Sequence, residues 1–130
     1  RLDEINAQKR KRAMHFIDAL SGRDELSFHR EDSTRHNYHL LVARVTNGTR
    51  DEMIRRMSRD KKVQCIIQYY PLYRYDLYKK LGYGNAECPQ TDEFYDNMIS
   101  FPFQHWMPED EFTKMIKLVR QALETLKDEN

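Results

Sequence analysis

The residues best suited to contact a ligand lie in one short stretch that follows an apolar run. The run at 63–68 is expected to form a strand, and it leads into Gln68, Tyr69, Tyr73 and Arg74. Tyrosine has an apolar ring face and a hydroxyl at its edge, so it can stack on a base or a sugar ring and also hydrogen-bond to it. Binding residues often lie on loops that follow strands. These four residues either contact a ligand or pack within the fold, and we take them as candidate substrate-binding residues.

Other kinds of chemistry find little support in the sequence. Two of the five histidines, His36 and His39, are three positions apart, but on a strand they would point to opposite faces, and no cysteine or carboxylate stands at ligand spacing. His39 is expected to lie in the core or at a sheet edge, bonded to the backbone. The sequence also lacks a GxSxG elbow, an HExxH motif and a catalytic-cysteine context. We therefore predict neither a metal site nor a catalytic residue in this chain.

Length and composition indicate one domain that binds no nucleic acid and crosses no membrane. The 130 residues include 22 Lys and Arg against 21 Asp and Glu, so no unpaired basic surface is expected for a nucleic acid. No apolar run approaches the roughly 20 residues of a membrane span. Cys65 and Cys88 form no CxxC pair and read as free thiols in a reducing compartment, with Cys65 buried. These features favour a cytoplasmic protein.

The first half of the chain predicts a helix, a loop, a strand and a second helix. Apolar spacing indicates a helix over 2–20, with the basic run 9–12 on its solvated face. The polar stretch 23–37 is expected to be a loop, and the apolar run 38–45 a strand covered on both faces. Thr49 and Glu52 then fit a capping box that opens a short helix.

The second half predicts a second strand, short helices, a third strand and a long final helix. The strand at 63–68 is followed by a helix over 72–81, in which Tyr75 and Tyr78 would pack against the last helix. A short helix should begin at Pro89, and a brief edge strand should cover 99–103. The segment 108–126 has the best amphipathic pattern of the chain. The short helix from Pro89 is expected to bury Phe94, Tyr95 and Met98.

This order of elements predicts an α+β fold, with a small three- to four-stranded sheet and helices mainly on one face. We treat residues 1–130 as a single domain, in which 1–22 form a linking helix and 36–130 form the α+β body. Because Arg1 stands inside a helical pattern without a preceding methionine, we expect the chain to be a piece of a longer polypeptide.

Several short motifs, in their order along the chain, resemble one enzyme family. They are Arg1-Leu2-Asp3-Glu4-Ile5-Asn6, Tyr38-His39-Leu40, Arg50-Asp51-Glu52, Tyr70-Pro71-Leu72, Leu81-Gly82-Tyr83 with Pro89, and Ser100-Phe101-Pro102. Together they resemble the carboxy-terminal, small domain of the DegT/DnrJ/StrS family of pyridoxal-phosphate-dependent aminotransferases. The resemblance covers nearly the whole chain. The sequence departs from the family at Gln68 and Tyr73, where many relatives carry histidine.

The resemblance implies a fold like the small domain of fold-type-I pyridoxal phosphate enzymes, and an activity that this chain would share with a missing domain. In such a parent enzyme an amino group passes from an amino acid, typically glutamate, to a nucleotide-linked keto sugar. Pyridoxal phosphate would be bound by the large domain, because no lysine here has a context that would activate its amine. The chain alone is therefore expected to bind no cofactor covalently and to be inactive. The resemblance also implies that the full-length protein is a homodimer.

Two alternatives stay open at the level of sequence. Some relatives are sugar dehydratases in which histidine replaces the cofactor-binding lysine, and that position lies outside this chain. A stand-alone ligand-binding or protein-binding module would use the tyrosine-rich surface instead. An RNA-binding domain is disfavoured by the balance of charge.

Overall fold

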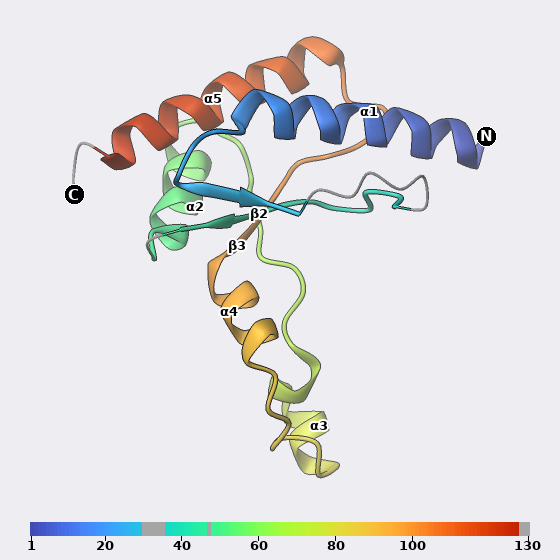
Figure 1. The fold of residues 1–130 in the computed structure, drawn as a ribbon, viewed down its shortest axis with the longest axis vertical. Coiled ribbons are helices and arrows are strands. Elements are labelled where there is room, and N and C mark those ends of the chain that lie inside the picture. The colour runs from blue at the N-terminus through green and yellow to red at the C-terminus, as the bar shows by residue number, and fades with distance from the viewer. Residues whose placement is uncertain (30–35, 47, 128–130) are drawn as a thin grey trace.

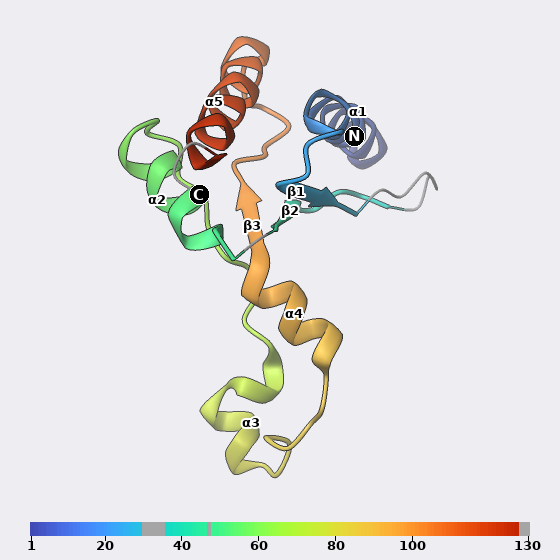
Figure 2. The same cartoon turned by 60° about the vertical axis from the view of Figure 1, so that its left-hand side comes forward.

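The computed structural model describes residues 1–29, 36–46 and 48–127, which form a layered body and a projecting arm (Figures 1 and 2). The helices are α1 (Leu2–Leu20), α2 (Arg50–Arg59), α3 (Asp76–Lys80), α4 (Pro89–Asn97) and α5 (Glu109–Lys127), with a 3-10 turn η1 (Leu72–Arg74); the strands are β1 (Leu26–Phe28), β2 (Leu41–Val45) and β3 (Met98–Phe101). The predicted α+β class, with a small sheet and helices mainly on one face, is confirmed.

The sheet is antiparallel, with the strand order β1-β2-β3. Leu26 pairs with Val45, and Leu41 pairs with Phe101. Along β2 the side chains alternate, because successive residues of a strand face opposite sides of the sheet. Leu41, Ala43 and Val45 are buried beneath the helices, whereas Val42 and Arg44 are half-buried on the other face.

The core of the body lies between this sheet and helices α1, α2 and α5. Phe16 of α1 is fully buried, and its ring lies 5.0 Å from the ring of Phe101, 6.0 Å from that of Phe28 and 6.3 Å from that of Phe112. These four residues come from α1, β3, β1 and α5, so one aromatic cluster joins four elements. The apolar stripe of α5 is buried as its periodicity predicted.

The basic run on α1 is not simply the solvated face that we expected from the sequence. Lys9 Nζ donates a hydrogen bond to the backbone oxygen of His39 (2.8 Å). Arg12 donates to the backbone oxygens of Gln104 (2.6 Å) and Met107 (2.5 Å). Because these acceptors belong to irregular segments, α1 fixes the loop before β2 and the loop after β3.

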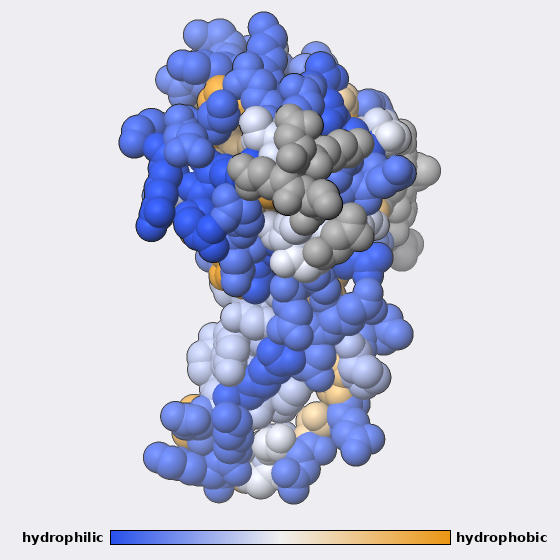
Figure 3. Space-filling model, turned by 90° about the vertical axis from the view of Figure 1, so that its left-hand side faces the viewer, coloured by the Kyte–Doolittle hydropathy of each residue, from blue (hydrophilic) through white to orange (hydrophobic). Residues whose placement is uncertain are grey.

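The arm comprises residues 69–97 and extends away from the helical layer in both ribbon views. As the structure describes them, η1, α3 and α4 contain no buried residue. Figure 3 shows a body surface that is mostly hydrophilic and a lower part with pale and orange areas. The exposed apolar side chains of the arm are Tyr69, Tyr70, Leu72, Tyr75, Leu77, Leu81, Tyr83 and Phe94.

Two strand predictions are wrong. The segment 23–37, expected as a loop, contains β1, and residues 30–35 of it lie outside the described residues. The segment 63–68, expected as a strand, is irregular and makes a single bridge, between Ile66 and Ser100. Its apolar residues are nevertheless partly covered, and Cys65 is buried as predicted, so that the pKa of its thiol rises to about 12.

Further differences concern helix ends and side-chain contacts. The capping box is wrong, because Thr49 makes no side-chain cap and Glu52 instead accepts a hydrogen bond from Arg56 (2.8 Å). The expected helix over 72–81 divides into η1 and α3, which ends before Gly82, a residue with a φ of +89° that favours glycine. The expected strand 38–45 begins only at Leu41.

Tyr75 and Tyr78 do not pack against α5 as expected. Their segment lies in the arm, far from α5 in Figure 1, and Tyr75 is 44% exposed. Met98 is buried as predicted, whereas Tyr95 is half-buried and Phe94 is exposed.

Replacing Phe16 by alanine is expected to lower the free energy of unfolding by about 3–5 kcal/mol, because it leaves a cavity among three other rings. Urea denaturation followed by circular dichroism measures this change. The control is Leu2→Ala on the same helix, whose side chain is 70% exposed and whose loss should change stability little. Equal effects of the two substitutions would contradict the position assigned to Phe16.

Candidate functional site

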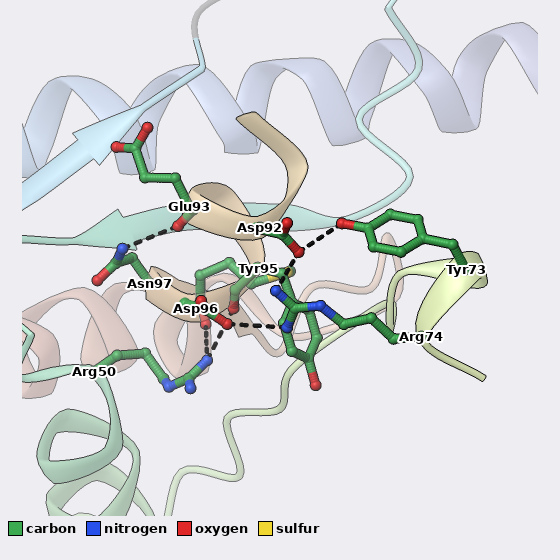
Figure 4. A network of polar contacts seen from close by, with 9 residues as sticks. Arg50, Tyr73, Arg74, Asp92, Glu93, Tyr95, Asp96 and Asn97 are labelled. Carbon is green, nitrogen blue, oxygen red and sulfur yellow. Dashed lines mark hydrogen bonds and ion pairs between the residues drawn. The ribbon is translucent and has the colours of Figure 1, made fainter. Parts of the chain in front are cut away.

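A polar cluster ties η1 to α4 at the middle of the arm (Figure 4). The hydroxyl of Tyr73 donates a hydrogen bond to Oδ1 of Asp92 (2.5 Å), and Arg74 Nη2 contacts the same oxygen. Arg74 Nη1 donates to Asp96 (3.2 Å). Asp92 and Asp96 are four residues apart on α4, so both carboxylates face η1. One guanidinium is thus paired with two carboxylates.

The shared hydrogen bond moves the pKa values of Tyr73 and Asp92 in opposite directions. Donation to Asp92, with burial and the negative charge nearby, raises the pKa of Tyr73. The same hydrogen bond, together with Arg74, lowers the pKa of Asp92. The stability that Asp92 contributes is therefore present above its ordinary pKa and is lost as the pH falls through the lower, folded value. The contribution of Tyr73 is present below its ordinary pKa and is lost as the pH rises through the higher, folded value.

Aromatic rings complete this part of the arm. The guanidinium of Arg74 lies over the ring of Tyr95, 5.5 Å from its centroid. The ring of Tyr70 is edge-on both to Tyr75 (4.9 Å) and to Tyr95 (5.4 Å). At the base of the arm, Arg50 of α2 donates to the backbone oxygens of Tyr95 (3.1 Å) and Met98 (3.3 Å). The arm is therefore joined to the body through α4.

The other two candidate residues lie where the arm meets the body. Gln68 is half-buried and lines a cavity of about 390 Å³ between segments 39–40, 64–68 and 100–104. Tyr69 follows it, is 63% exposed, and is joined to Gln68 by a cis peptide bond. His39, expected in the core or at a sheet edge, is exposed and lines the same cavity.

The structure thus divides the four predicted residues into two pairs. Tyr73 and Arg74 meet at Asp92, whereas Gln68 and Tyr69 remain available at the cavity and its neighbouring surface. Sequence reasoning missed Asp92 and Asp96, although two carboxylates four apart on a short helix are a signal for an arginine partner. It also missed the contribution of Gln64 and Gln104 to the cavity, because these residues belong to different segments.

The described residues do not fit a site that binds pyridoxal phosphate covalently. Burial lowers the pKa of Lys9, but its amine donates to the His39 carbonyl and lies 5.0 Å from the centroid of the Phe103 ring. The other lysines with described side chains are exposed or half-buried. Among the described residues no group of His, Cys, Asp and Glu has the arrangement of a metal site. None of the helices described here has the length and apolar character needed to span a membrane.

Comparison with known proteins gives one family. The sequence profile of the DegT/DnrJ/EryC1/StrS aminotransferase family matches residues 1–120. A curated relative, the spore coat polysaccharide biosynthesis protein SpsC of Bacillus subtilis (strain 168), is 26% identical over 137 residues. That alignment covers 95% of this chain and 33% of SpsC. The chain thus spans about a third of the length of the curated relative.

Solved structures share the fold. The aminotransferase TlmJ from Streptoalloteichus hindustanus matches with a TM-score of 0.83 at 23% identity, over 97% of this chain and 34% of TlmJ. The PLP form of Spr1654 from Streptococcus pneumoniae, a proposed sugar aminotransferase, matches with a TM-score of 0.76 at 19% identity, over 94% of this chain and 32% of its own. At such identities the structural similarity establishes the fold alone.

Replacing Asp92 by asparagine is expected to lower the pKa of Tyr73 toward its ordinary value of about 10, because the negative charge at the hydroxyl is lost. Titration of ¹³C-labelled tyrosine by NMR measures the pKa of this residue. Asp76→Asn is the matched control, because Asp76 is an arm carboxylate that contacts Lys79 and not Tyr73. An unchanged Tyr73 pKa in the Asp92 variant would show that the hydrogen bond is not formed.

Proposed function

This chain belongs to the DegT/DnrJ/EryC1/StrS aminotransferase family, and we propose that it is the small domain of a sugar aminotransferase that uses pyridoxal phosphate. The parent enzyme transfers an amino group from an amino acid, glutamate in this proposal, to a keto sugar linked to a nucleotide. The match of the family profile to residues 1–120 is the observation that carries the proposal.

The chain supplies the substrate side of the reaction and not the cofactor site. When bound to the missing domain, pyridoxal phosphate provides the electron sink for amino transfer. No described lysine or anion site of this chain fits that group, so the residues proposed here only bind and orient the sugar. Gln68 offers a hydrogen-bonding amide, and Tyr69 offers an exposed ring face.

Tyr73 and Arg74 have a different role in this proposal. Both already contact Asp92, and Arg74 is also paired with Asp96, so its charge is largely balanced within the arm. They hold the 69–74 segment against α4 and thereby place Tyr69 and Gln68. We retain them as part of the substrate-binding surface through this positioning.

The remaining features of the proposal concern the whole protein. Residues 1–22 are the linking helix and 36–130 the body of a domain that lacks its cofactor-binding partner domain. The full-length enzyme is a cytoplasmic homodimer whose substrates are an amino-acid donor and a nucleotide-linked keto sugar. The coverage of about one third of each relative supports a domain that is part of a longer protein.

A polypeptide in which this chain follows its cofactor-binding domain is expected to convert many equivalents of glutamate to 2-oxoglutarate per active site only when a nucleotide-linked keto sugar is present to accept the amino group. A coupled dehydrogenase assay measures the product. Tyr69→Ala should raise KM for the sugar roughly tenfold, because one aromatic contact of about 1.4 kcal/mol is lost. Leu72→Ala, also on the exposed side of the arm, is the control. Continued product formation beyond one equivalent per active site without the sugar, or equal KM values for the two variants, would contradict the proposal.

The 130-residue chain by itself is expected to form no stoichiometric adduct with pyridoxal phosphate after reduction with borohydride. The reason is that Lys9, the one lysine with a lowered pKa among the described side chains, donates to a backbone carbonyl. Mass spectrometry of tryptic peptides measures the modification of each lysine. Complete and specific labelling of one lysine would show that the chain contains a cofactor site of its own.

A further inference from the structure

The cavity beside Gln68 has an unusual lining for its size. Its volume of about 390 Å³ lies within the range of ligand-binding pockets. Three glutamines and a histidine contribute polar groups, and the apolar part of the lining includes Leu40, Ile66, Pro102 and Phe103. The cavity therefore combines apolar walls with several hydrogen-bonding groups.

The three glutamine side chains have no hydrogen-bond partner within the described part of the chain. The side-chain amides of Gln64, Gln68 and Gln104 take part in none of its hydrogen bonds, although Arg12 contacts the backbone oxygen of Gln104. Each amide offers two donor hydrogens and an acceptor oxygen. A sugar hydroxyl both donates and accepts, so these amides match a ring that carries several hydroxyls.

Charge is the second feature that restricts the ligand. Among the described residues that line the cavity there is no Asp, Glu, Lys or Arg. Lys9 and Arg12 contact lining residues from outside, but each donates to a backbone carbonyl there, Lys9 to that of His39 and Arg12 to that of Gln104. A phosphate or diphosphate group is normally bound by arginine, lysine or a helix N-terminus. The cavity therefore has groups that suit the uncharged part of a ligand, and it lacks the cationic groups that usually bind a phosphate.

The cavity is also held in shape by hydrogen bonds to the backbone of its lining residues. Lys9 and Arg12 of α1 fix the segments before β2 and after β3 through backbone oxygens. The Ile66–Ser100 bridge, with nitrogen-to-oxygen distances of 3.0 and 2.8 Å, fixes the third segment against β3. A site whose walls are set before binding loses less entropy when the ligand enters.

We propose that this cavity binds the uncharged, hydroxylated ring of the sugar substrate, with Gln64 and Gln104 as hydrogen-bonding residues beside Gln68, and that the nucleotide diphosphate binds elsewhere. The inference rests on the proposed function for the identity of the ligand as a sugar. It adds to the proposed function the residues that hydrogen-bond to the sugar ring, and it places the ring and the nucleotide diphosphate at separate sites.

The test is an NMR titration of the ¹⁵N-labelled 130-residue chain with two probes, methyl α-D-glucopyranoside and UDP. The neutral sugar is expected to shift the side-chain amide signals of Gln64 and Gln104 in a saturable manner at millimolar concentrations. UDP should leave these signals unchanged. Gln64→Leu should weaken sugar binding about tenfold, the equivalent of one hydrogen bond of about 1.4 kcal/mol. Gln90→Leu on α4 is the matched control, because Gln90 is exposed and outside the cavity.

The backbone amide spectrum reports whether each variant is folded. If Gln64→Leu is unfolded, Gln104→Leu is used in its place. Failure of the neutral sugar to shift the two amides, or shifts of the same signals by UDP, would overturn the inference. Sugar shifts in this chain combined with no amino transfer by the longer polypeptide would support the cavity as a sugar site and overturn only the proposed reaction. Amino transfer by the longer polypeptide, combined with no sugar shifts in this chain, would support the proposed reaction and overturn the cavity as the sugar site.

Discussion

One carboxylate oxygen, Oδ1 of Asp92, holds together the part of the molecule that has no hydrophobic core. It accepts from Tyr73 and contacts Arg74, and both of these residues belong to η1 on the opposite side of the arm. Because η1, α3 and α4 as described contain no buried residue, the arm gains less stability from apolar burial than the body does. Charge-assisted hydrogen bonds and ring contacts replace a core there. The positions of Gln68 and Tyr69 depend on this cluster, since both residues shortly precede η1.

In the body, two cations of helix α1 hold irregular segments in place. Lys9 and Arg12 look like ordinary surface charges in the sequence, yet both donate to backbone oxygens of irregular segments. The Lys9 ammonium also lies 5.0 Å from the centroid of the Phe103 ring, and the Arg12 guanidinium 5.6 Å from that of Phe112, so both cations contact aromatic rings as well. The shape of the cavity beside Gln68 therefore depends on α1, which contributes none of its lining.

The sequence predicted what depends on periodicity and missed what depends on distant pairing. Helix α5 has a long apolar stripe, and its burial was predicted correctly, whereas in α1 only the second half of the expected stripe is buried and Leu2 is 70% exposed. Strand β1 was missed because three residues in a polar region carry no measurable alternation. The segment 63–68 has the composition of a strand, but only Ile66 pairs with a neighbour.

The candidate site shows the same limit. Residue types and the position after the 63–68 run selected Gln68, Tyr69, Tyr73 and Arg74 as one set of candidates, without dividing them into two pairs. Their surroundings depend on residues 18 or more positions away, such as Asp92 and Gln104. Tyr75 was wrongly predicted to pack against the last helix. Helical spacing indicates which residues share a face of a helix, but it does not indicate which part of the protein that face contacts.

The single bridge at Ile66 has a consequence for the behaviour of the chain in concentrated solution. Strand β3 lies at the margin of the sheet, where unpaired backbone groups would attract a strand from another molecule. The bridge occupies Ser100 on that margin, and Pro102, which comes directly after the strand, has no amide hydrogen to offer. An irregular segment and a proline thus occupy this margin of the sheet, and both are features by which native sheets oppose intermolecular strand addition.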